Sequence, residues 1–215
     1  MQLTRQAARA DVKQLARLLV ESHPDPYSAG GGPVAFHRRV AHVLAALPED
    51  GVTTEQLLRM LRPLVASIGD GHTGIHGGPD AGMSPSTARP WLGWEAVEEQ
   101  LYVRTVYREQ ERPLLGARLV ALEGIPFLDL ARRMERLRGF ENVYTNLVHL
   151  AEALTEAAML GDLIETAELP RQLALDLTLP DGTARSIQVP FSDEPPGVAI
   201  DPPSGIALPS PNAAN

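Results

Sequence analysis

The sequence predicts an α+β protein with a helical N-terminal unit, a β-rich unit with inserted helices, and a disordered Pro-rich C-terminal tail. Three observations lead to this prediction. Apolar residues recur at helical spacing in three segments before residue 69, and they alternate with a period of two in several segments after residue 100. A connector rich in Gly, Pro and Ser lies between His76 and Arg89, and no periodic pattern follows Ser192. The predicted units therefore comprise residues 1–78, 88–191 and 192–215.

The helical unit begins with an amphipathic helix that includes residues 11–21 and starts in the preceding Ala/Arg-rich stretch. Proline suits the first turn of a helix, so we expect a second helix from Pro33 to Leu47 with apolar residues along one face. A third helix begins after Thr53, which is predicted to form a capping box with Gln56. Pro63 is expected to kink this third helix.

The β-rich unit contains two predicted strands, Leu101–Val106 and Ala117–Leu122, the second of which ends in a Glu-Gly turn. A short helix over residues 127–137 and a longer helix from Asn142 to Gly161 follow, because apolar residues return to helical spacing there. Strict alternation on both sides of a Pro-Asp-Gly turn then predicts a hairpin over Leu173–Val189 with one apolar face.

Composition limits the classes of function. The 215 residues carry a net charge of −8 without a Lys/Arg cluster, which argues against a nucleic-acid partner. Cysteine is absent, so disulfides, a thiolate nucleophile and Cys-ligated zinc are excluded. No apolar run reaches the ~20 residues of a membrane helix, and the first residues lack the apolar core of a secretory signal. We therefore expect no membrane partner and a cytoplasmic location as written, or a periplasmic or secreted one if a start lies upstream.

The strongest candidate for chemistry is the turn after the third helix, which contains Gly69 and Gly71. Within this turn Asp70, His72 and Thr73 bring together a carboxylate, an imidazole and a hydroxyl. Histidine is the usual proton shuttle near neutral pH, and a neighbouring carboxylate can fix its tautomer, so we predict His72 as a base with Asp70 and Thr73 beside it. Spacing alone favours the structural alternative, in which the aspartate bonds its own backbone and the histidine has no chemical role.

A metal site is the other interpretation of this stretch. His72 and His76 have the four-residue spacing of zinc ligands on a helix, but their glycine-rich surroundings disfavour a helix and no third ligand is evident. We therefore predict no metal ion and no cofactor.

The remaining histidines and the tryptophans are interpreted structurally. His23, which precedes a proline, is interpreted as a helix stop. Three further histidines lie on helical faces and are expected at the surface or its boundary: His37, His42 and His149. Trp91 and Trp94 are expected to anchor the core of the β-rich unit, whereas exposure of these rings would indicate a ligand platform.

Several sequence blocks occur in an order that resembles a known family. They are Leu18–Tyr27, Phe36–Val40, Thr54–Leu57, Leu64–Thr73, Leu101–Val103, Gly116–Pro126, Glu141–Asn142 and the hairpin Leu173–Val189. Together they resemble the N-terminal part of peptidase family S41, the tail-specific (C-terminal processing) and tricorn-like proteases. The Asp-Gly-His-Thr sequence after an apolar helix is the most specific block, and Gly116–Pro126 is also similar to the strand-turn segment of PDZ-like domains.

The resemblance implies a serine endopeptidase that binds an extended peptide or a protein C-terminus. In the tricorn-like branch the histidine of the matching block, here His72, is the general base for a serine, whereas a lysine has that role in the processing branch. The family's Ser/Lys domain is expected after the hairpin, where this sequence enters its Pro-rich tail. Because a base without its nucleophile cleaves nothing by this route, we expect the chain to be inactive alone, with a separate chain as the candidate source of the serine.

A non-catalytic, PDZ-like peptide-binding module is the alternative function. Such a module adds an extended peptide as a further strand at a sheet edge, and the strands Leu101–Val106 and Ala117–Leu122 would supply the sheet. A plain α+β scaffold without a ligand is the third interpretation.

Overall fold

The computed structural model describes residues 1–75, 88–166 and 168–202, and the chain divides into two units. The first unit contains Met1–Pro85 and Glu135–Glu141, and the second contains Ser86–Met134 and Asn142–Asn215. The predicted α+β class is confirmed. In this division the short segment Glu135–Glu141 belongs to the first unit and interrupts the second.

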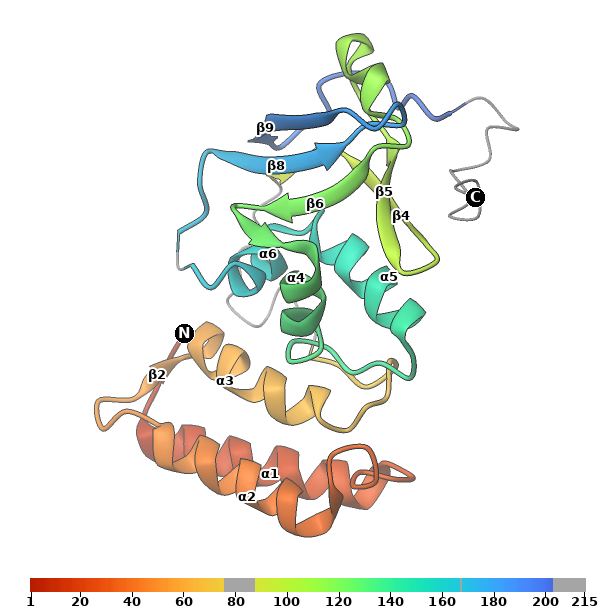
Figure 1. The fold of residues 1–215 in the computed structure, drawn as a ribbon. Helices are drawn as coiled ribbons and strands as arrows, with labels where there is room; N and C mark the ends of the chain where they lie inside the picture. The colour runs from red at the N-terminus through yellow and green to blue at the C-terminus, as the bar shows by residue number, and fades with distance from the viewer. Residues whose placement is uncertain (76–87, 167, 203–215) are drawn as a thin grey trace. The chain divides into compact units, whose positions relative to one another are not determined.

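Three helices form most of the first unit, as the sequence predicts (Figure 1). Their bounds are α1 (Arg5–Ser22), α2 (Gly32–Ala46) and α3 (Thr54–Ala66). Two short strands, β1 (Gln2–Leu3) and β2 (Val52–Thr53), pair antiparallel before α1 and α3. The apolar faces of the helices meet in one buried cluster, which includes Ala8, Val12, Ala16, Phe36, Val40, Val43, Leu47, Leu57, Leu61 and Leu64.

The start and the end of α3 fix the position of the turn that follows. Thr53 Oγ1 accepts the N–H of Gln56 at 3.1 Å, and Gln56 Oε1 accepts the N–H of Thr53 at 2.8 Å, so the predicted capping box is confirmed. The helix continues past Pro63 to Ala66. Ser67 then caps it by donating its hydroxyl to the carbonyl oxygen of Leu64 at 2.7 Å.

An antiparallel sheet of seven strands forms the β-rich unit, with the order β3-β9-β8-β6-β5-β4 and with β7 paired to β6. The bounds are β3 (Arg89–Pro90), β4 (Gly93–Val97), β5 (Gln100–Thr105), β6 (Arg118–Leu122), β7 (Ile125–Pro126), β8 (Gln172–Thr178) and β9 (Ala184–Ser192). The predicted hairpin is confirmed as β8 and β9, which pair from Gln172↔Pro190 to Thr178↔Ala184. The two predicted strands correspond to β5 and β6, and both lie inside the sheet.

Helices α4 (Phe127–Met134), α5 (Val143–Ala153) and α6 (Ala157–Leu163) lie together against β4, β5 and β6 (Figure 1), and a 3₁₀ helix, η2 (Glu109–Leu114), joins β5 to β6. Asn142 caps α5 by accepting the N–H of Thr145 at 2.9 Å, so the predicted start is confirmed. The prediction of one helix from Asn142 to Gly161 is wrong, because the helix breaks after Ala153 and Gly161 lies within α6. Apolar residues are buried on both sides of the break, so their spacing alone did not reveal it.

Two further expectations are corrected in the second unit. His149 lies on α5 with only 6% of its surface exposed, because this face of the helix points into the core. The segment after Ser192 is not uniformly a tail. Val106 donates its N–H to the carbonyl oxygen of Ile200 at 3.1 Å and accepts that of Ile200 at 2.8 Å, and Asp201 accepts the Thr105 hydroxyl. Residues 203–215 lie outside the described part of the chain.

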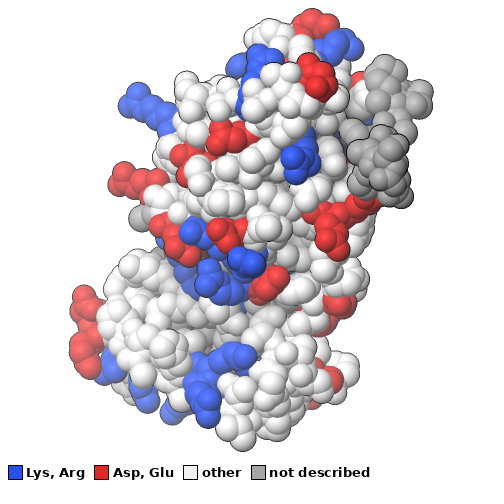
Figure 2. Space-filling model, viewed as in Figure 1, with Lys and Arg blue, Asp and Glu red and all other residues white. Residues whose placement is uncertain are grey.

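The described residues contain no helix that is both long enough and apolar enough to span a membrane. On the face drawn in Figure 2, Lys and Arg side chains are interspersed with Asp and Glu.

Candidate functional site

The turn after α3 depends on the absence of a side chain at two positions. Gly69 has φ of +73°, and a Cβ at this residue would lie 2.4 Å from the Cβ of Ala29. Gly71 has no positive φ, but a Cβ there would meet the Glu141 carboxylate at 2.7 Å. Gly69 therefore reverses the chain, and Gly71 lets it pass close to an acidic side chain.

Asp70 is the centre of the hydrogen bonds in this turn. Its Oδ1 accepts the backbone N–H of His72 at 2.9 Å, and its Oδ2 accepts the hydroxyl of Thr73 at 2.6 Å. The hydroxyl of Thr73 and the N–H of His72 hold the pKa of Asp70 well below its ordinary value, although partial burial opposes them. Asp70 is therefore ionised at neutral pH, and Thr73 acts as a donor that fixes its carboxylate.

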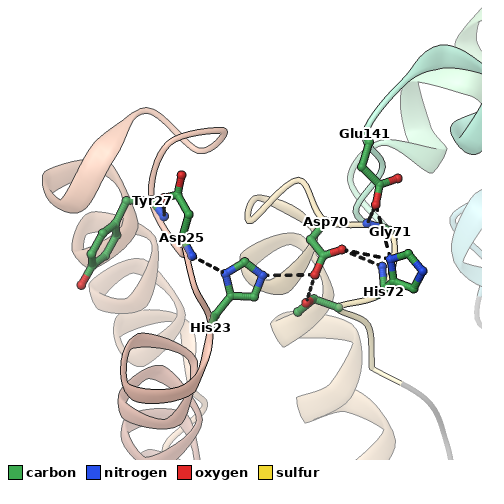
Figure 3. Close-up of polar contacts among 8 residues, drawn as sticks. His23, Asp25, Tyr27, Asp70, Gly71, His72 and Glu141 are labelled. Atoms are coloured by element: carbon green, nitrogen blue, oxygen red, sulfur yellow. Dashed lines mark hydrogen bonds and ion pairs between the residues drawn. The ribbon is translucent and has the colours of Figure 1, made fainter.

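His23 also reaches Asp70, 47 residues away in the sequence. His23 ends α1 as its C-cap, as predicted, and its Nε2 lies 3.1 Å from Asp70 Oδ2 (Figure 3). Its Nδ1 accepts the backbone N–H of Asp25 at 3.1 Å, so the ring proton is on Nε2 and is donated to the carboxylate. The interpretation of His23 as a helix stop alone missed this contact, because no local pattern connects two residues so far apart.

The His72 side chain is 94% exposed, and its Nδ1 faces two carboxylates. Nδ1 lies 3.4 Å from Asp70 Oδ1 and 3.6 Å from Glu141 Oε1, whereas Nε2 points away from both (Figure 3). Glu141 Oε1 also accepts the N–H of Gly71 at 2.8 Å, so its position is fixed by the same turn. Glu141 stands in one of the blocks that carry the family resemblance, but the sequence analysis assigned it no role at this site, since it lies 70 residues beyond the turn.

This arrangement brings together all three predicted site residues and adds His23 and Glu141. An imidazole whose one nitrogen faces carboxylates while the other points away from them has the arrangement of a general base. The distances from Nδ1 to the two carboxylate oxygens are nevertheless longer than a hydrogen bond. Asp70, His72 and Glu141 are also the described residues whose ligand atoms lie close enough, within 4.8 Å of one another, to hold a metal ion. His76, the other histidine considered for zinc, lies outside the described residues.

The tryptophans of the second unit do not form an open platform. Trp91 is partly buried and donates its Nε1–H to the carbonyl oxygen of Ser192 at 2.9 Å. The Arg89 guanidinium lies 3.9 Å from the centre of its ring, and the Tyr107 ring meets it edge-on. Trp94 lies in β4 and is also partly buried. The contacts of Trp91 and the partial burial of Trp94 favour the structural interpretation of these rings.

No protein-family model matches the sequence, and no curated protein matches it. Solved structures with a similar fold include a serine-to-alanine mutant of CPAF, mature CPAF, and mature CPAF complexed with lactacystin. Their TM-scores are 0.61, 0.60 and 0.60, with sequence identities of 16%, 15% and 15%. The fold resembles that of CPAF, a chlamydial protease. The similarity covers 87% of this chain but only 34–35% of CPAF, so the chain spans about a third of that protein's length.

Proposed function

We propose that this chain is the histidine-bearing part of a serine-type peptidase of the S41 kind, and that His72 is its general base. The observation that carries the proposal is the His72 ring, whose Nδ1 faces Asp70 and Glu141 while Nε2 points away from them (Figure 3). The similarity of the fold to part of CPAF and the ordered sequence blocks around Asp-Gly-His-Thr support the same function.

In this mechanism, a serine hydroxyl attacks the carbonyl carbon of the scissile peptide bond and passes its proton to Nε2 of His72. The imidazolium then gives that proton to the departing amine, which leaves the acyl group bound to the serine. Water attacks this acyl group and passes a proton to Nε2, and the imidazolium returns the proton to the serine oxygen as the acid is released. Nε2 accepts a proton only if the neutral ring carries its own proton on Nδ1. The carboxylates of Asp70 and Glu141 favour that tautomer and stabilise the imidazolium, because Nδ1 faces both of them.

The nucleophilic serine belongs, in this proposal, to polypeptide beyond these 215 residues, since the chain corresponds to about a third of CPAF. Ser67 is unsuited to the role, because its hydroxyl caps α3. The substrate class is an extended peptide or a protein C-terminus.

The test is the tautomer of His72, read from the ¹⁵N chemical shifts of its ring at a pH where the ring is neutral. His23 serves as an internal reference for the opposite tautomer, because its Nδ1 accepts a hydrogen bond and its proton is on Nε2. We expect the Nδ1–H form to predominate at His72 and to decline in Glu141→Gln. Predominance of the Nε2–H form at His72 would contradict the proposal.

Hydrolysis of an unfolded protein such as casein tests the reaction itself. We expect activity only when the chain is combined with a serine-bearing polypeptide, and we expect His72→Gln to abolish it while His42→Gln, at an exposed position on α2, leaves it unchanged. Hydrolysis by the chain alone that resists serine-directed inhibitors would refute the assignment of the base to this chain and of the nucleophilic serine to another polypeptide.

Peptide binding at a sheet edge is the second candidate, and one observation favours it. Strand β4 is at the end of the strand order and pairs only with β5 among the described strands, with α5 packed beside it. The two strands expected to supply the sheet, β5 and β6, lie inside it, so we assign the accepting edge to β4. Saturable shifts of the amide signals of residues 93–97 with a C-terminal peptide, and none with its N-methylated analogue, are expected because pairing needs main-chain donors; no saturable binding would exclude this function.

A further inference from the structure

Three potential ligand atoms of different residues face one another beside the turn. Asp70, His72 and Glu141 each offer one ligand atom within 4.8 Å of the other two, and His72 Nδ1 faces both Asp70 Oδ1 and Glu141 Oε1. The two distances from Nδ1, 3.4 and 3.6 Å, are longer than the 2.7–3.2 Å of an N–H···O hydrogen bond. They equal the distance between neighbouring ligands of tetrahedral zinc, because bonds of about 2.0–2.2 Å give tetrahedral edges of about 3.3–3.6 Å.

The two carboxylates are held in place by the main chain. Asp70 Oδ1 accepts the N–H of His72 at 2.9 Å, and Glu141 Oε1 accepts the N–H of Gly71 at 2.8 Å. Each oxygen keeps a second lone pair for another partner. Hydrogen bonds of this kind orient metal ligands and are part of what distinguishes a metal site from a chance cluster of acids.

We infer that Asp70, His72 and Glu141 form a binding site for a divalent transition-metal cation, with Zn²⁺ as the ion that fits best. One imidazole and two carboxylates suit Zn²⁺ better than Mg²⁺ or Ca²⁺, which prefer ligand sets made only of oxygen. Two carboxylates neutralise the charge of the ion, and the exposure of His72 leaves the fourth position to water. This site differs from the His72/His76 pair considered on the sequence, since two of its ligands are acidic and one comes from the segment Glu135–Glu141.

The site has a consequence for the reaction, and this consequence rests on the proposed function. A metal at Nδ1 uses the lone pair of that nitrogen, so the neutral ring must carry its proton on Nε2. Nε2 is then a donor and accepts no proton from a serine. Zn²⁺ at this site is therefore an inhibitor of the base, and its removal by a chelator restores the base.

The test measures metal binding directly, without reference to hydrolysis. Zn²⁺ is titrated calorimetrically into the full chain, and Co²⁺ is added as a probe whose visible absorption reports tetrahedral coordination. We expect one specific site, a loss of at least about tenfold in Zn²⁺ affinity for Glu141→Gln, and a larger loss for His72→Ala. His42→Ala is the matched control at another exposed histidine, and it is expected to bind as the unmodified chain does. Glutamine at position 141 keeps an acceptor for the N–H of Gly71, so its effect does not depend on unfolding of the turn.

Equal Zn²⁺ affinities for the unmodified chain, His72→Ala and Glu141→Gln would overturn the inference, as would the absence of tetrahedral Co²⁺ absorption. The two proposals fail separately. Zn²⁺ binding without inhibition of the combined peptidase would leave the metal site standing and contradict the role of His72 as base. Absence of Zn²⁺ binding, with the Nδ1–H tautomer present at His72, would contradict the metal site and leave the role of His72 as base standing.

Discussion

Removal of the His23 side chain is expected to uncouple the end of α1 from the turn after α3. In His23→Ala, Asp70 loses the donor that reaches its Oδ2 at 3.1 Å, and Asp25 loses the acceptor of its N–H. A hydrogen bond to a charged group contributes roughly 1.5–3 kcal/mol, but Asp70 is 30% exposed and keeps two other donors, so we expect a loss of about 1–1.5 kcal/mol.

The assay is a double-mutant cycle on the free energy of unfolding in urea, followed by the helical circular dichroism signal. His23→Ala, Asp70→Ala and the double variant are compared at pH 7, and we expect a coupling energy of about 1 kcal/mol. The same cycle with His42→Ala in place of His23→Ala is the control and is expected to be additive within about 0.5 kcal/mol. An additive cycle for His23 and Asp70 would refute the contact as a source of stability.

Two further predictions concern the same turn. Because folding lowers the pKa of Asp70, the contribution of its ionised carboxylate to stability is complete at neutral pH and is lost as the pH falls below the ordinary value of 3.8. The difference in unfolding free energy between Asp70→Asn and the unmodified chain should therefore shrink over that pH range. A difference that stays constant would contradict the assignment. Gly69→Ala should cost more than the ~1–2 kcal/mol of a left-handed alanine, because its Cβ also meets Ala29 at 2.4 Å. Gly182→Ala, at φ of +85° with nothing within 4 Å, isolates the backbone part of that cost, and equal losses for the two variants would mean that Ala29 yields freely.

The sequence was sufficient where the signal is local. The capping box at Thr53, the Asn142 cap and the alternation that defines β8 and β9 each depend on residues within a few positions of one another. The helix break after Ala153 was missed because buried residues continue across it. The edge strand β4 was missed because it is short and Ala96 alone among its five residues is buried, so it has no clear alternation.

The candidate site was predictable only in its sequential part. Asp70, His72 and Thr73 stand in one block, and the structure brings their side chains together as the spacing suggests. His23 and Glu141 come from segments 47 and 70 residues away from the residues they contact, and nothing near them in the sequence marks that proximity. The structural and the chemical interpretations of Asp70 both apply to its carboxylate. It accepts the backbone N–H of His72, which stabilises the turn, and it also faces Nδ1 of the His72 ring.

The return of Glu135–Glu141 to the first unit has a consequence for how that unit is made. Glu141 accepts the N–H of Gly71, and Gly139 lies against the main chain of Asp70. The turn at Asp70 and Gly71 therefore depends on residues that are translated long after α3. When only the three helices and the following turn have emerged from the ribosome, the turn still lacks Glu141. The imidazole therefore acquires its second carboxylate late in synthesis, and a fragment cut after residue 85 would carry the histidine without it.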